Sequence, residues 1–212
     1  MNSFFLLALQ YSYMSLSSNQ GNDLVTYARA VLEANYGAKK PKIPESLVGV
    51  FKEKLGVFVT LHKRGELRGC IGFPEPTYKL GYAVEHAALS AALEDPRFPE
   101  VEAEEMDSIV VEVSVLTKPE LMKVADPKEY VKKIVVGRDG LIAELGYSRG
   151  LLLPQVPVEW KWDAQEFLLH TCNKAGLPMT AYLDKGFRLY VFQAQIFAEE
   201  KPRGNVVEQK IC

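Results

Sequence analysis

The strongest pattern in the chain is an alternation of apolar and polar residues at 57–72, which predicts a β-hairpin. Its strands are VFVTLH and ELRGCIG, and Lys63-Arg64-Gly65 would form a three-residue loop. That loop pairs residue 62 with residue 66 and so decides which side chains share a face. Arg68 and Cys70 would project together from one face. The opposite, core face would hold Val57, Val59, Leu61, Leu67 and Ile71.

Apolar residues at helical spacing predict three longer helices, and a loop with a short helix is expected between residues 119 and 132. The first begins near Asp23 and ends before Gly37, and the second covers residues 78–94, where Asp95-Pro96 stops it. Its stripe of small residues suits a helix that lies flat on a sheet. The third opens with a capping box at Asp163 and closes at Gly176, and it would bury Cys172.

Further apolar runs predict more strands. The most regular alternation is at 108–116, and shorter runs lie at 134–137, 140–147, 150–155 and 188–197. Strands in runs, with helices interspersed and without a regular β-α-β order, indicate an α+β fold: a two-lobed domain with mostly antiparallel sheet and flanking helices.

Length and composition favour one domain at residues 22–200, an N-terminal extension at 1–21 that is dispensable in part, and a polar tail at 201–212. The apolar run Phe4–Leu9 is too short to span a bilayer, so no membrane segment is expected. A net charge of −2 disfavours nucleic acid as the main partner. Homo-oligomerisation stays open.

Three cysteines without a C-x-x-C pair argue against a disulfide framework or a zinc cage and favour the reducing cytoplasm. Three scattered histidines without an H-x-x-x-H pair argue against a catalytic metal. Glycine-rich nucleotide loops and the G-x-S-x-G elbow of serine hydrolases do not occur either, so no cofactor is predicted.

Cys70 is the leading candidate for chemistry. Arg68 would share its strand face, and Gly69 and Gly72 would leave the surrounding backbone open to close approach. A nucleophilic thiolate needs a nearby positive charge, and Arg68 would be about 7 Å away along the strand. His62 shares the face but would lie too far away for a dyad. The alternative is a small packed cysteine between glycines, and this reading stays open.

Two other stretches carry candidate binding residues. In DPRFP (95–99), Arg97 either pairs with Asp95 as part of a cap or reaches an anionic ligand. In GLLLPQVPVEWKWD (150–163), a stiff proline-bracketed loop would present Gln155 and Glu159 to a pocket, or else serve only as a rigid connection whose tryptophans fill the core.

Taken together, LRGCIG at 67–72, DPRFP at 95–99 and the segment from GLLLPQVPVEW to FLLHTCNKAGLP at 150–178 resemble the AMMECR domain family. The resemblance covers roughly residues 22–200 and implies a two-lobed α+β domain. It establishes no biochemical role, although the LRGCIG motif has been suspected of being functional. Prokaryotic members are associated with radical-SAM and Memo-type proteins in a proposed modification system.

Two functions follow as hypotheses. In the first, the protein is an enzyme or part of one: Cys70 acts as nucleophile or thiol carrier, Arg68 and Arg97 hold a small anionic group, and Gln155 or Glu159 orients it. In the second, it is a non-catalytic adaptor whose hairpin and 150–160 segment form a groove for a partner protein. The residues alone do not decide whether the protein is an enzyme or on which molecule it acts.

Overall fold

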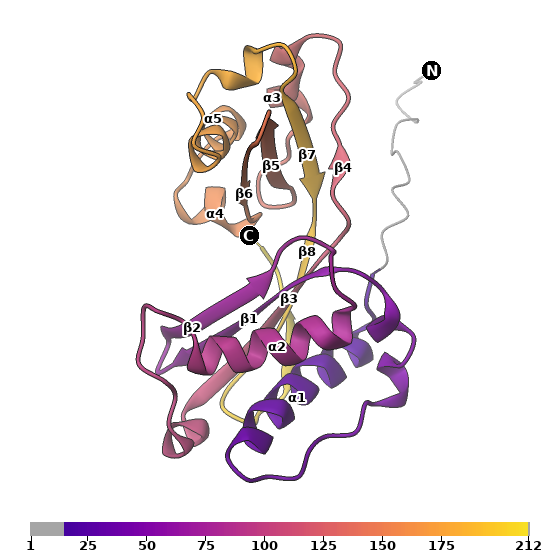
Figure 1. Ribbon diagram of the computed structural model, residues 1–212, viewed down its shortest axis with the longest axis vertical. Coiled ribbons are helices and arrows are strands. Elements are labelled where there is room, and N and C mark those ends of the chain that lie inside the picture. The colour runs from indigo at the N-terminus through magenta and orange to yellow at the C-terminus, as the bar shows by residue number, and fades with distance from the viewer. Residues whose placement is uncertain (1–14, 212) are drawn as a thin grey trace, which may run out of the picture.

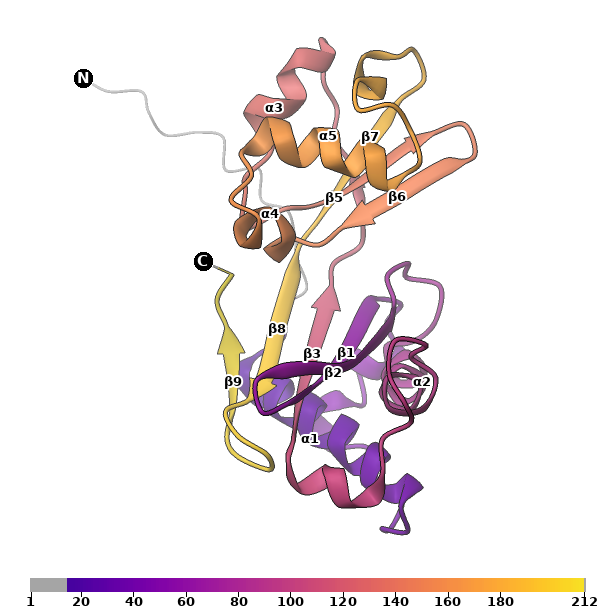
Figure 2. The same cartoon turned by 90° about the vertical axis from the view of Figure 1, so that its left-hand side faces the viewer.

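The computed structural model describes residues 15–211 and confirms the α+β fold, with two antiparallel sheets in two lobes (Figures 1 and 2). Among the described strands, every pairing is antiparallel. The first sheet has the order β2-β1-β3-β8-β9, and its strands are Glu66–Phe73, Gly56–Lys63, Ile109–Leu116, Ala194–Glu199 and Val206–Gln209. The second has the order β4-β7-β5-β6, with Glu120–Leu121, Arg188–Phe192, Gly140–Leu145 and Ser148–Leu152.

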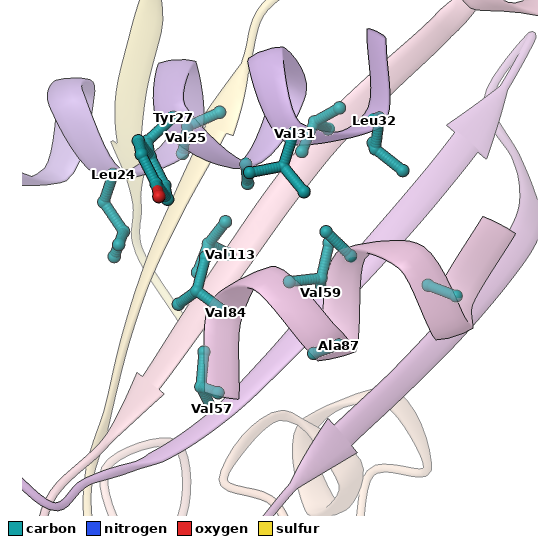
Figure 3. Packing of buried hydrophobic residues seen from close by; sticks show 14 of the residues in the cluster. Leu24, Val25, Tyr27, Val31, Leu32, Val57, Val59, Val84, Ala87 and Val113 are labelled. Carbon is teal, nitrogen blue, oxygen red and sulfur yellow. The ribbon is translucent and has the colours of Figure 1, made fainter. Parts of the chain in front are cut away.

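Two helices cover one face of the first sheet, and together they form the first lobe. They are α1 (Ser18–Asn35) and α2 (Leu80–Leu93). Leu24 and Leu32 of α1 and Val84 of α2 pack against β-branched residues of the central strands, such as Val59 (Figure 3). The small residues of α2 let it approach β1 and β2 closely, as the sequence predicts.

The second lobe is built on the smaller sheet. Its helices are α3 (Tyr130–Lys133), α4 (Gln155–Glu159) and α5 (Ala164–Lys174). The capping box at Asp163 is formed, and Phe167 and Cys172 of α5 are fully buried, so the predicted core position of Cys172 is confirmed. The lobes meet where Leu116 packs with Ile142 and Phe192.

Several boundaries differ from the sequence prediction. Residues 134–137 do not form a strand: a turn covers residues 136–138, and the carboxylate of Asp139 accepts a hydrogen bond from the amide of Val135 at 2.8 Å. The predicted strand 188–197 divides at Gln193 into β7 and β8, which belong to different sheets. The predicted stiff loop after residue 153 contains the short helix α4.

The ends of the chain also add structure. Helix α1 begins at Ser18, five residues before the predicted start, because Ser17 and Gln20 form a capping box. Residues 18–21 of the predicted extension therefore belong to this helix, whereas residues 1–14 lie outside the described part. In the predicted polar tail, strand β9 pairs with β8.

Candidate functional site

The LRGCIG segment lies on β2, and its register differs from the prediction. Lys63 pairs with Glu66, so the loop has two residues, Arg64 and Gly65, both with positive φ as a tight hairpin turn requires. Beyond the turn, residue 62 pairs with 67 but residue 61 pairs with 69. Arg68 is therefore the extra residue of a β-bulge, which the alternation of apolar and polar residues does not reveal.

This bulge separates the two side chains that were predicted to share a face. Arg68 turns to the helix side, where it donates hydrogen bonds to Glu105 at 2.9 and 2.8 Å and to the carbonyl of Pro99 at 2.8 Å. Cys70 projects from the opposite face. The prediction that Arg68 and Cys70 project together was thus wrong, and so was the core position of Leu67, which is 39% exposed.

On that opposite face Cys70 is part of a row that crosses three strands. Thr60 of β1 pairs with Cys70 of β2 on one side and with Glu112 of β3 on the other. The Thr60 hydroxyl donates a hydrogen bond to Cys70 Sγ at 3.2 Å. Directly paired residues have their Cβ atoms about 5 Å apart, so the thiol, the hydroxyl and the carboxyl group are immediate neighbours. We call this row, together with His62, the outer-face site.

His62 joins the row from the next outward position of β1. Its Nε2 atom lies 3.8 Å from a carboxylate oxygen of Glu112, an ion pair only when the imidazole is protonated. Burial lowers the pKa of His62. Burial, and secondarily the charge of Glu159, raise the pKa of Glu112. Both shifts favour the uncharged forms, so the imidazole and the carboxyl group lie together as a potential proton acceptor and donor.

The Cys70 thiol is held in its protonated form. Burial raises its pKa, the charges of Glu112 and Asp95 add to that effect, and the hydrogen bond from Thr60 and the charge of Arg97 oppose it. The free protein therefore does not prepare a thiolate at neutral pH. Any reaction of the sulfur needs a base at the moment of reaction.

The DPRFP turn supports the backbone of Cys70. The carboxylate of Asp95 accepts a hydrogen bond from the Cys70 amide at 2.9 Å, and Arg97 donates to the Cys70 carbonyl at 3.1 Å. Arg97 also donates to Asp95 at 2.9 and 2.7 Å, which lowers the pKa of that carboxyl group far below its usual range. The turn thus occupies the free edge of β2 and satisfies groups that a neighbouring strand would otherwise pair.

The two glycines beside Cys70 are approached by the protein itself. A Cβ atom on Gly69 would lie 2.0 Å from the carbonyl oxygen of Ala91 in α2. One on Gly72 would lie 2.3 Å from the carbonyl oxygen of Val57 and 2.4 Å from the ring of Phe58. Close packing of helix, sheet and aromatic ring therefore accounts for glycine at both positions.

The structure places Gln155 and Glu159 on α4, at the end of the second lobe that faces the first lobe (Figure 1). Among residues 15–211, the Oε1 atom of Gln155 is a buried side-chain oxygen without a hydrogen-bond partner. Glu159 is exposed, and its charge reaches Glu112. Trp160 is 68% exposed and stacks on Trp162, so of the two tryptophans only Trp162 packs against the second core.

Sequence reasoning missed Thr60 and Glu112 as partners of Cys70. Their positions on the polar face of predicted strands were visible, but the pairing that aligns them depends on the two-residue turn and the bulge. Within the described residues, no group of three or more His, Cys, Asp or Glu side chains could hold a metal ion. Nor is any described helix long and apolar enough to cross a bilayer.

The fold and the hairpin define a two-lobed α+β protein that carries LRGCIG on a strand. The sequence of the chain is similar to those of several known proteins. The AMMECR1 family model matches residues 25–197. The protein MJ0810 of Methanocaldococcus jannaschii is 59% identical over 92% of this chain and 98% of its own. A protein of Methanothermobacter thermautotrophicus is 54% identical over 89% and 98%. The chain therefore belongs to the AMMECR1 family.

A solved structure shares the architecture. The crystal structure of the uncharacterised protein PH0010 from Pyrococcus horikoshii has a TM-score of 0.80 to this chain and 50% sequence identity. The match covers 92% of this chain and 98% of that one. The relatives agree on the family and the fold, and their names carry no biochemical role.

Proposed function

We propose that the protein is an enzyme, or the component of one, in which the thiol of Cys70 is the reactive group. The observation that carries this proposal is the row of Cys70, Thr60 and Glu112 across three strands, with His62 beside it. A thiol next to a hydroxyl and a proton-accepting pair is the composition that thiol-dependent catalysis needs.

In this proposal the sulfur stays protonated until a substrate arrives. The thiol proton then passes to the His62–Glu112 pair, with the Thr60 hydroxyl between the sulfur and the carboxyl group. The sulfur forms a bond to an electrophilic carbon of the substrate, the group that this carbon loses departs with the electron pair of the broken bond, and the proton held by the His62–Glu112 pair passes to that departing group. Thr60 supports this role because its hydrogen bond to Cys70 Sγ stabilises the developing thiolate.

Arg97 is the residue that we propose for holding a small anionic group of the substrate. Its side chain is 54% exposed and lies against the backbone of Cys70. Arg68 supports the site indirectly, since it ties the bulge to Glu105 and its side chain is only 12% exposed. Gln155 and Glu159 would orient the substrate from the second lobe, because the Oε1 atom of Gln155 has an unused acceptor position.

The proposed setting is a reducing cytoplasm, which keeps Cys70 and the second described cysteine, Cys172, as free thiols. As the family resemblance suggests, the protein would act in a modification system together with radical-SAM and Memo-type proteins. Co-expression of tagged protein with such partners, followed by affinity purification, tests this assignment. Recovery of neither partner with the wild-type chain would end it.

Alkylation of a chain that carries Cys172→Ser and Cys212→Ser tests the reactive thiol, since Cys70 is then its sole cysteine. The rate of iodoacetamide addition, followed by mass spectrometry in native buffer, should rise with pH through a midpoint above that of an ordinary free thiol. A Cys70 that stays unmodified in the folded protein at every pH up to unfolding would overturn the proposal.

The alternative is an adaptor that binds a partner through the same face, and one observation favours it: Leu67, next to His62 on this face, is 39% exposed. Complementation of a deletion strain separates the two functions. The enzyme requires that Cys70→Ser fails whereas Leu67→Glu works. The adaptor requires the reverse, with Cys172→Ser as a control in both cases.

A further inference from the structure

Helix α2 also carries apolar side chains on the side opposite its most deeply buried residues. Its buried stripe, which includes Val84, Ala87 and Ala91, packs on α1 and on the first sheet. At 3.6 residues per turn, the helical members of a second stripe lie on the opposite side of the helix within an arc of about 60°, and the ring of Tyr78, two residues before the helix, lies beside that of Tyr82. We call this second stripe the α2 stripe; it consists of Tyr78, Tyr82, His86, Leu89 and Leu93.

The side chains of the α2 stripe form an ordered and accessible surface. Tyr78 and Tyr82 have ring centroids 5.2 Å apart, and Tyr82 and His86 have theirs 3.9 Å apart. The tyrosines are 44% and 48% exposed, and His86 is exposed as well. Leu89 and Leu93 extend the stripe; they are half-buried because they also pack against the first core. Neighbouring exposed aromatic side chains on one surface are typical of protein interfaces.

Polar residues that would keep this side of α2 in water are scarce. Between Leu80 and Leu93 the helix has one carboxylate, Glu85, which accepts a hydrogen bond from the hydroxyl of Tyr27 in α1. A helix that is apolar nearly all round is usually buried on all sides. Here this side is covered only in part among residues 15–211: Tyr78 contacts the ring of Phe73 at 5.3 Å between centroids, yet Tyr78 and Tyr82 stay exposed.

We propose that a second copy of this chain covers the α2 stripe, with the two α2 helices packed antiparallel about a two-fold axis. The first argument is the spacing. Tyr82 and Leu89 lie at equal distances from a point between Glu85 and His86, and so do Tyr78 and Leu93. Antiparallel pairing about that point places each tyrosine against a leucine of the other copy, which is the self-complementary contact that a two-fold interface needs.

The second argument is charge. Lys79 and Glu94 are exposed and lie just outside the two ends of α2, where the Glu94 carboxylate also accepts a hydrogen bond from the Ser90 hydroxyl at 2.6 Å. Antiparallel pairing brings Lys79 of one copy beside Glu94 of the other, at both ends of the interface. Parallel pairing would instead bring like charges together. The charges therefore favour the same arrangement as the spacing, with an apolar centre and a charged rim.

This pairing leaves the outer-face site free. Helix α2 covers the face of the first sheet that carries Val57 and Val59, whereas Cys70 and Glu112 lie on the other face. The dimer therefore does not depend on the function proposed above, and its failure would leave that function untouched.

Sedimentation equilibrium of the full chain over a concentration series tests the proposal. The wild-type chain should form a reversible dimer. Tyr82→Glu should weaken dimerisation by about a hundred-fold, since it places charge in the apolar centre of both halves. Tyr147→Glu is the matched control, because Tyr147 is fully exposed on a distant turn and its change should have no effect. Circular dichroism would verify that each variant is folded.

A charge exchange tests the antiparallel geometry. Lys79→Glu alone and Glu94→Lys alone should each weaken the dimer by about ten-fold, because two attractive pairs become two repulsive ones. The double variant Lys79→Glu/Glu94→Lys should restore wild-type dimerisation. A wild-type chain that stays monomeric, a dimer that survives Tyr82→Glu, or a double variant as weak as the single ones would each overturn the proposal.

Discussion

The hydroxyl group of Thr60 on β1 donates a hydrogen bond of 3.2 Å to the sulfur of Cys70 on β2, the edge strand of the first sheet. On its other side Thr60 pairs with Glu112, whose charge acts on the same thiol in the opposite direction. The hydroxyl lowers the pKa of Cys70 and the carboxylate raises it. Burial is the main cause of the raised pKa of the thiol, and these two neighbours, which can be changed separately, adjust it in opposite directions.

Replacing Thr60 by Val removes the donor and keeps the β-branched shape. Because the hydrogen bond stabilises the thiolate, its loss should raise the pKa of Cys70 and slow alkylation near pH 8 by about three- to ten-fold, the factor that corresponds to one net hydrogen bond. The pH profile of iodoacetamide addition measures this. Thr60→Ser retains a hydroxyl and should react like the wild-type chain. Equal rates for Val and Ser would contradict the hydrogen bond.

Replacing Glu112 by Gln should act in the other direction. The carboxylate raises the pKa of Cys70, so its removal should lower that pKa and speed alkylation near pH 8.

The stability of the Glu112→Gln variant should change as well. Because the pKa of Glu112 is raised in the folded protein, its contribution is present at low pH and is lost as pH rises through that value. In urea unfolding, the gain in stability of Glu112→Gln over the wild-type chain should therefore be larger at pH 8 than at pH 5. An equal gain at both values would contradict the shift.

The sequence predicts the hairpin well but not its register. Alternation identifies both strands, and Val57, Val59, Leu61 and Ile71 are on the core side as expected. The alternation does not determine the length of the loop, because a two-residue and a three-residue turn both fit Lys63-Arg64-Gly65. A bulge costs one unpaired residue and leaves the composition unchanged, so nothing in ELRGCIG indicates that Arg68 leaves the ladder.

The candidate site could be located from the sequence around Cys70, but its partners could not. Glu112 is more than forty positions away along the chain and aligns with Cys70 only through Thr60, once three strands are in register. For the DPRFP turn the sequence left two alternatives, an Arg97–Asp95 pair in a cap or an Arg97 that reaches an anionic ligand, and in the structure Asp95 and Arg97 bind each other. That their target is the edge of β2 follows from the position of α2 above that strand, which is a tertiary property.

Glu105 should make the protein sensitive to acid. Its hydrogen bonds with Arg68 lower its pKa from 4.5 to about 2, so the stabilisation is complete above pH 4.5 and is lost as pH falls toward 2. Glu105→Gln should destabilise the protein at pH 7 by about 1–2 kcal/mol. The difference from the wild-type chain should shrink at pH 2, where the wild-type carboxyl group is largely protonated. Glu104→Gln, at an exposed neighbour, should change neither value.

Asp95 should matter for stability more than Arg97. Asp95→Ala leaves the amide of Cys70 without its acceptor and the guanidinium of Arg97 without its partner, and should cost about 2 kcal/mol in chemical unfolding. Arg97→Ala removes a half-exposed side chain and should cost about half as much. If the two variants were equally stable, the edge of β2 would not depend on the carboxylate.

Gly69 should tolerate no larger residue, for a reason of packing. The Cβ atom of alanine at position 69 would lie 2.0 Å from the carbonyl oxygen of Ala91, which is helix backbone and cannot rotate away. Helix α2 or strand β2 would have to shift, at a cost of about 2–3 kcal/mol. Gly49→Ala is the control, since position 49 is open and has helical dihedral angles that favour alanine. Thermal unfolding should show a lower midpoint for Gly69→Ala and an unchanged or slightly higher one for Gly49→Ala. The same midpoint for both variants would mean that the contact between α2 and β2 yields without cost.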